Sequence, residues 1–219
     1  MGWVTRYNVL FLDLLPSSPD PARDLAELSL DPSLARFSGV SAWVPESPAR
    51  IPAVRTFLEG RSGEPSPRLL YLRHPERLAA LLARVSKSSY ELRPRDLGNF
   101  ARESGAPPGA KALGLWSSLR ARLSGIPWLV AFLGGTLAAA GLSYPRVGPR
   151  GRLYREGPAL LVAMAVGAFL VTALGDAHVE TIRHLYVFQA LCDLILVADA
   201  AWLAQTLASR FARRPEVVR

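Results

Sequence analysis

The sequence predicts a mostly α-helical protein in which a small, loop-rich soluble domain is followed by three transmembrane helices. Three stretches with almost no charge occupy residues 126–144, 158–175 and 185–208. Before them, helix-start signals and prolines divide residues 1–125 into short helices, with no alternating pattern typical of strands. Half of the 219 residues are hydrophobic and 20% are charged, so the chain is more apolar than an ordinary soluble protein.

The soluble part carries recognisable helix signals. Asp20-Pro21 and Asp31-Pro32 pair an N-cap residue with a proline at the first helical position. In "HPERLAALLARVSKSSYEL", apolar residues recur at positions i, i+3, i+4 and i+7 from Leu78, which predicts an amphipathic helix. The segment "LWSSLRARLSG" predicts a short helix just before the membrane.

The three apolar stretches are long enough to cross a bilayer, which takes roughly 17–25 helical residues. Gly134, Gly135 and Gly167 are small residues of the kind found where membrane helices pack closely. The alternative is three buried helices of a soluble all-α protein. Three such stretches in succession, separated by short arginine-rich or polar loops, favour the membrane.

Arginines predict the orientation of the spans. The loop 145–157 and the basic tail 209–219 each carry four arginines, whereas the loop between the second and third spans carries only Arg183. The positive-inside rule then places the first loop and the tail in the cytoplasm, and residues 1–125 outside the cell membrane. Because residues 1–21 do not read as a signal peptide, we expect further spans upstream of Met1. In the alternative, the domain stays cytoplasmic and the arginine pattern misleads.

Three polar residues, Gln189, Asp193 and Asp199, interrupt the third apolar stretch. A carboxylate near the bilayer centre costs roughly 2.5–3.5 kcal/mol, so such residues usually pair with another helix. The two aspartates are six residues apart and on different helix faces, which excludes a general acid/base pair. The first two spans offer no cation at this depth, so we expect the partners in upstream helices that this chain lacks. The alternatives are a structural role and a role in a substrate or proton path.

Two clusters of polar residues are candidates for binding a lipid phosphate or a sugar. One lies in the turn-rich segment "ELRPRDLGNFARESGAPPGAK", and the other in "DAHVETIRH" at the start of the third span. Guanidinium and amide groups suit anionic headgroups. The alternatives are a solvated basic loop beside the membrane and a salt-bridged helix end. The candidate residues are Arg93, Arg95, Asn99, Glu180, Arg183 and His184.

Other kinds of site are not expected. Cys192 is the single cysteine, and His178 and His184 lie on different faces of a helix, so no metal site and no disulfide are predicted. No phosphate-binding loop and no serine-hydrolase motif occurs, and we expect no cofactor. The cations are dispersed and half of the chain is in the membrane, which argues against nucleic-acid binding. The expected partners are membrane lipids.

Several stretches resemble the C-terminal portion of a family of large multispanning bacterial membrane proteins, some labelled glycan-biosynthesis hexose transferases. They are "RYNVLFLDLLPSSPDPARDLAELSLDPSLARFSG", "YLRHPERL", "LRPRDLGNFARESGAPPGAKALGLWSSLR" and "RHLYVFQALCD". The resemblance implies a lipid-linked sugar donor, a glycan acceptor outside the cell membrane, and a catalytic acid in an early loop that this chain lacks. The catalytic residues are therefore unassigned. The competing hypotheses are a non-catalytic, membrane-anchored interaction domain and a transporter-like bundle with Asp193 in a water-filled cavity.

Overall fold

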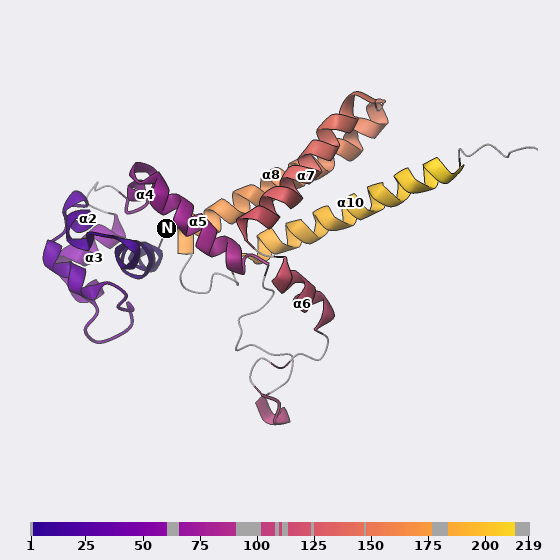
Figure 1. Cartoon of the computed structure of the whole chain (residues 1–219). Helices are drawn as coiled ribbons and strands as arrows, with labels where there is room; N and C mark the ends of the chain where they lie inside the picture. The colour runs from indigo at the N-terminus through magenta and orange to yellow at the C-terminus, as the bar shows by residue number, and fades with distance from the viewer. Residues whose placement is uncertain are drawn as a thin grey trace, which may run out of the picture.

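The structure is a computed structural model that describes residues 2–60, 66–90, 102–107, 110, 114–123, 125–146, 148–176 and 184–212. Within these ranges the chain is helical and has no strand, as the sequence predicts. The short N-terminal helices gather at one end, and three long helices project from that end (Figure 1). This arrangement confirms a helical domain followed by three apolar spans.

The N-terminal part is a succession of short helices, several of which begin at a proline: Pro21, Pro32, Pro48, Pro52 and Pro75. Asp20 caps one of them by accepting a hydrogen bond from the Arg23 amide at 3.1 Å, and Asp31 caps another from Ser33 at 2.8 Å. The elements are α1 (Trp3–Tyr7), η1 (Asn8–Leu14), η2 (Leu15–Ser17), α2 (Pro21–Glu27), η3 (Pro32–Phe37), η4 (Pro48–Arg50), α3 (Pro52–Glu59), α4 (Leu69–Arg73), α5 (Pro75–Ser88), η5 (Arg102–Ser104) and α6 (Leu115–Arg122).

The core of this part forms around η1, a π-helix in which every residue is buried. Tyr7 stacks on Phe11 with ring centroids 4.7 Å apart, and the Phe11 carbonyl accepts a hydrogen bond from the Gly39 amide at 2.7 Å. The amphipathic helix α5 contributes Leu81 and Val85 to the same core, in the register that its apolar spacing predicts. The apolar segment η1, near the N-terminus, is thus an interior element of the domain.

The three spans are α7 (Ile126–Ser143), α8 (Pro149–Asp176) and α10 (Tyr186–Ala212), with the short helix η6 (Tyr144–Arg146) after α7. Only 28%, 17% and 28% of their apolar windows are buried, so most of their apolar surface faces outward. A soluble protein would bury these faces, and this exposure therefore supports the membrane over the alternative of a soluble bundle. Helix α8 begins at Pro149 rather than at residue 158, because proline suits the first helical position.

Helix α8 lies between the other two spans and packs against both of them. Phe169 of α8 contacts Phe188 of α10 with ring centroids 5.4 Å apart. At the opposite end, the Arg155 guanidinium lies 4.7 Å from the ring centroid of Trp202. These two contacts hold α8 and α10 antiparallel to each other.

The N-terminal helices dock onto one end of the spans. The amide of Gly125, at the start of α7, donates to the Ser86 carbonyl of α5 at 3.1 Å. Arg68 donates to the Leu174 carbonyl near the end of α8 at 2.6 Å. The beginning of α7, the end of α8 and the beginning of α10 therefore all lie beside the N-terminal part.

Candidate functional site

The sequence-predicted binding residues fall mostly outside the described ranges. The structure does not describe five of them, so their predicted roles stay predictions: Arg93, Arg95, Asn99, Glu180 and Arg183. The structure describes His184, which is exposed just before α10, together with the three polar residues of the third span: Gln189, Asp193 and Asp199.

Asp193 forms an ion pair with Arg120 of α6. The Arg120 Nη1 atom lies 2.7 and 2.6 Å from the two carboxylate oxygens of Asp193. Helix α6 precedes the first span, so the expectation that the partner of Asp193 lies in upstream helices is wrong. Arg120 lies outside the first two spans, and the chain folds it back against the third.

Arg120 is completely buried, which explains why it needs this partner. Its Nε donates to the Tyr90 carbonyl at 3.3 Å, and its guanidinium lies 4.6 Å from the Tyr90 ring centroid. The Asp193 side chain keeps 39% of its surface exposed. The Arg120 guanidinium thus pairs with Asp193 and lies over the Tyr90 ring. These contacts join α6, the end of α5 and α10.

Asp199 also has a partner within this chain. The Thr136 hydroxyl of α7 donates to one of its carboxylate oxygens at 2.6 Å, and Thr136 is buried. The carboxylate therefore links the first span to the third. Gln189 is buried one turn before Asp193.

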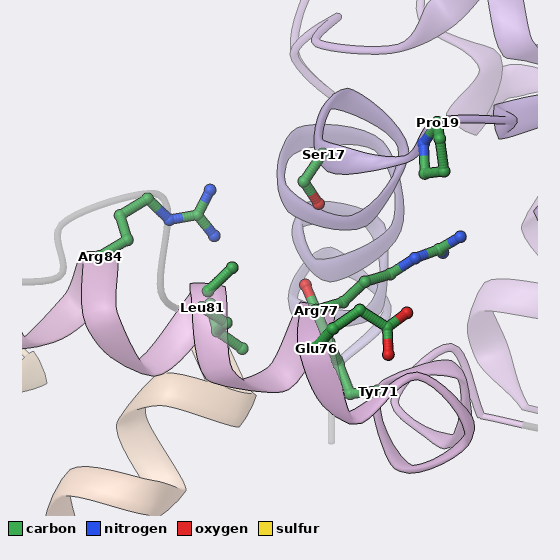
Figure 2. A pocket seen from close by; sticks show the side chains of 8 residues that line it. Ser17, Pro19, Tyr71, Glu76, Arg77, Leu81 and Arg84 are labelled. Atoms are coloured by element: carbon green, nitrogen blue, oxygen red, sulfur yellow. The ribbon is translucent and has the colours of Figure 1, made fainter.

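A pocket of about 300 Å³ lies between η2 and α5, and its arginines are paired with buried carboxylates. Figure 2 shows Arg77 and Arg84 on either side of Leu81. Arg77 contacts the buried carboxylate of Asp24 at 2.6 Å, and Arg84 pairs with the buried carboxylate of Asp13. These pairs fix α5 against the N-terminal helices, and they leave little net positive charge for an anion.

Two other cations, Arg6 and Arg68, bond to backbone instead. Arg6 donates to the Phe57 carbonyl at 3.2 Å, and Arg68 donates to the Leu174 carbonyl. Among the side chains that the structure describes, neither has a carboxylate partner. Burial lowers the pKa of Arg68 from its usual value, and the nearby charge of Arg6 lowers it further.

A cavity of about 520 Å³ opens beside these two arginines, at the end of the spans. Its walls come from α1, α8 and the start of α10, and they are mainly apolar. Its polar lining residues are Thr5, Thr172 and His184. The Thr172 hydroxyl donates to the His184 carbonyl at 3.2 Å, which closes α8 onto the start of α10. His184 is thus the one predicted binding residue that the described part of the chain places at a cavity.

A second concave surface, the apolar groove, runs along α7 and α8 beneath α5. It has a volume of about 390 Å³ and an entirely apolar lining. Val130, Leu133, Gly134 and Leu137 line it from α7, together with Ile126 and Leu129, and this spacing marks one face of that helix. The remaining lining residues are Leu82, Val162, Val166, Phe169 and Phe188.

Comparison with known proteins places this architecture among membrane domains. A family model described as the YfdI N-terminal transmembrane domain matches residues 1–216. That description concerns an N-terminal domain, whereas the resemblance in the sequence implied a C-terminal portion. No curated protein and no solved structure matches the chain.

Proposed function

Because the chain belongs to the YfdI N-terminal transmembrane domain family, we propose that it is the lipid-binding membrane domain of a hexose transferase of bacterial envelope glycan assembly. In this role the domain holds the hydrocarbon chain of a lipid-linked sugar between its spans. The sugar then lies at the end of the bundle where the N-terminal helices dock. The chemical step belongs to residues that are not assigned.

The apolar groove is the observation that carries this proposal. Its lining contains no polar surface, and every lining residue except Leu82 of α5 belongs to one of the spans. A water-soluble substrate would find no hydrogen-bond partner there, because recognition of such substrates needs a few placed polar groups. A hydrocarbon chain is the ligand whose chemistry matches this lining.

The arrangement of the chain supports placing the sugar at the docked end. The N-terminal helices, the Leu174 end of α8 and His184 share that end. The arginine pattern of residues 145–157 and 209–219 favours the opposite end as the cytoplasmic one. A lipid-linked sugar held in the groove would then present its headgroup outside the cell membrane.

Substitution within the groove tests the proposal. Val130 and Leu142 are both exposed on α7, but only Val130 lines the groove. We expect Val130→Trp to fill the groove and to weaken binding of a polyprenyl phosphate-linked hexose about tenfold in phosphatidylcholine nanodiscs. Leu142→Trp is the matched control and should leave binding unchanged. Equal binding by the two variants would contradict a chain-binding role for the groove.

The second candidate function is a non-catalytic, membrane-anchored structural domain. The ion pairs of Arg77 with Asp24 and of Arg120 with Asp193 favour it, because they join helices rather than offer free charges. If Val130→Trp leaves lipid binding intact, this candidate gains support. A transporter-like bundle is less favoured, because Asp193 and Asp199 each have a partner in the fold.

A further inference from the structure

We propose that Arg6 and Arg68 bind the phosphate of a membrane lipid at the docked end of the spans, with the lipid entering the cavity beside His184. This inference deepens the proposed function and rests on it for the identity of the lipid. It adds a headgroup site, formed by residues that sequence reasoning did not select.

The guanidinium groups of Arg6 and Arg68 have no acidic partner among the described side chains. Arg55, Arg77 and Arg84, by contrast, each contact a carboxylate. A guanidinium carries five N–H donors, and among the described residues Arg68 donates through its Nε to the Leu174 carbonyl. Among the described residues, the terminal nitrogens of Arg68 therefore have no hydrogen-bond partner, and they could donate to two oxygens of a phosphate.

The positive charges of Arg6 and Arg68 influence each other. The charge of Arg6 contributes to lowering the pKa of Arg68, after the larger effect of burial. Two partly buried like charges without a counter-ion destabilise one another, and an anion bound between them relieves this repulsion. The pair is therefore arranged in a way that favours an incoming anion.

The Arg6 side chain is held in place by the end of α3. Its Nη1 donates to the Phe57 carbonyl, and its guanidinium lies directly over Gly60. Gly60 has φ 70°, in the left-handed region, and a Cβ there would collide with the guanidinium. Glycine at this position serves both the helix end of α3 and the close approach of Arg6.

The two arginines adjoin a cavity at the docked end of the spans. Gly175 lines the cavity, and a Cβ on it would lie 3.7 Å from Nη2 of Arg68. Thr5, the residue before Arg6, lines the other side. The walls between them are apolar side chains of α8 and α10, so a lipid could place its phosphate at the arginines and its chain between the spans.

The phosphate could belong to a polyprenyl phosphate carrier or to an ordinary phospholipid, since both present the same oxygens. The test uses the full chain in phosphatidylcholine nanodiscs with three added probes: polyprenyl phosphate, the corresponding polyprenol, and phosphatidylglycerol. Binding is measured by native mass spectrometry. We expect polyprenyl phosphate to bind at least tenfold more tightly than polyprenol. A preference over phosphatidylglycerol identifies the carrier as the source, and equal binding identifies the phospholipid.

Variants then locate the site. We expect Arg6→Gln and Arg68→Gln each to reduce the phosphate-dependent part of binding about tenfold. The control Arg23→Gln removes an exposed arginine of α2 and should have no effect. Equal affinity of the unsubstituted chain for polyprenol and polyprenyl phosphate would overturn the proposal, without requiring any variant to fold. If Val130→Trp still weakens both of these lipids, the proposed function survives and only the phosphate site fails.

Discussion

Arg120 of α6 donates through one nitrogen to both carboxylate oxygens of Asp193 in α10, at 2.7 and 2.6 Å. The contact joins residues 73 positions apart in the chain. It ties the helix before the first span to the third span, and it fixes the level at which the N-terminal part meets the bundle.

Removing one member of this pair should strongly destabilise the fold. Asp193→Ala leaves the buried Arg120 without a counter-charge, which costs about 3–5 kcal/mol. Arg120→Ala should cost less, because the Asp193 side chain that remains is 39% exposed. The double variant Arg120→Met/Asp193→Leu removes both charges, and it should recover most of this loss. The measurement is the free energy of unfolding in detergent. The exposed Arg122→Ala is the control. Single variants as stable as the parent would show that the pair does not hold the fold together.

The hydrogen bond between Thr136 and Asp199 should stabilise the bundle more modestly. Hydrogen bonds between membrane helices are worth about 0.6 kcal/mol on average, with a maximum of about 1.7. We expect Thr136→Val to lower the free energy of unfolding by an amount in this range. Thr206→Val is a matched control, because the Thr206 hydroxyl bonds only to the Trp202 carbonyl of its own helix. Equal effects of the two substitutions would argue against the link between spans.

Alkaline pH should destabilise the N-terminal part through Tyr71. Burial raises the pKa of the Tyr71 hydroxyl above its usual value of 10.0, and the Asp13 carboxylate raises it further. The folded state therefore keeps a neutral phenol where the unfolded chain ionises, so this stabilisation is full below pH 10 and is lost as pH rises above it.

The slope of unfolding free energy against pH, measured between pH 9 and 11, checks this prediction. Tyr71→Phe should make the slope shallower above about pH 10, by up to about 1.4 kcal/mol per pH unit. Tyr186→Phe is the control, because Tyr186 is exposed on α10. An unchanged slope in Tyr71→Phe would mean that the phenol ionises in the folded state as readily as in the unfolded chain.

Helix α6 should lie in the membrane interface. Leu115, Trp116 and Leu119 are exposed on this helix, while Arg120 holds it against α10 at the start of the spans. Tryptophan is typical of the headgroup level. In a variant whose only tryptophan is Trp116, brominated lipids should quench its fluorescence. A variant that retains only Trp43, exposed on the N-terminal part, should escape quenching. Equal quenching of the two would place α6 no deeper than the N-terminal part.

Local sequence signals predicted the helices well. Span length, the Asp-Pro helix starts and the apolar spacing of α5 are all properties of neighbouring residues, and the structure confirms each of them. The start of α8 was misplaced because the arginine-rich segment before Pro158 looked like a loop, although Pro149 can begin a helix there.

Long-range contacts were not predictable in the same way. Nothing near Asp193 in the sequence indicates that Arg120 reaches it, because that contact depends on how α6 folds back against α10. Arg6 and Arg68 lie 62 positions apart, and only the fold reveals that neither has a carboxylate partner among the described side chains. His184 was chosen from sequence and does line a cavity.

The most direct test of the account is the topology of the chain in intact bacterial cells. In a Cys192→Ala background, single cysteines replace Ser33 in the N-terminal part, Gly148 between α7 and α8, and Ser209 near the end of α10, all of them exposed. We expect a membrane-impermeant maleimide to label Ser33→Cys from outside, and to label the other two only after the membrane is opened. Labelling of Ser33→Cys and Gly148→Cys from the same side would contradict the three spans, and the inverse pattern would contradict a headgroup site outside the cell membrane.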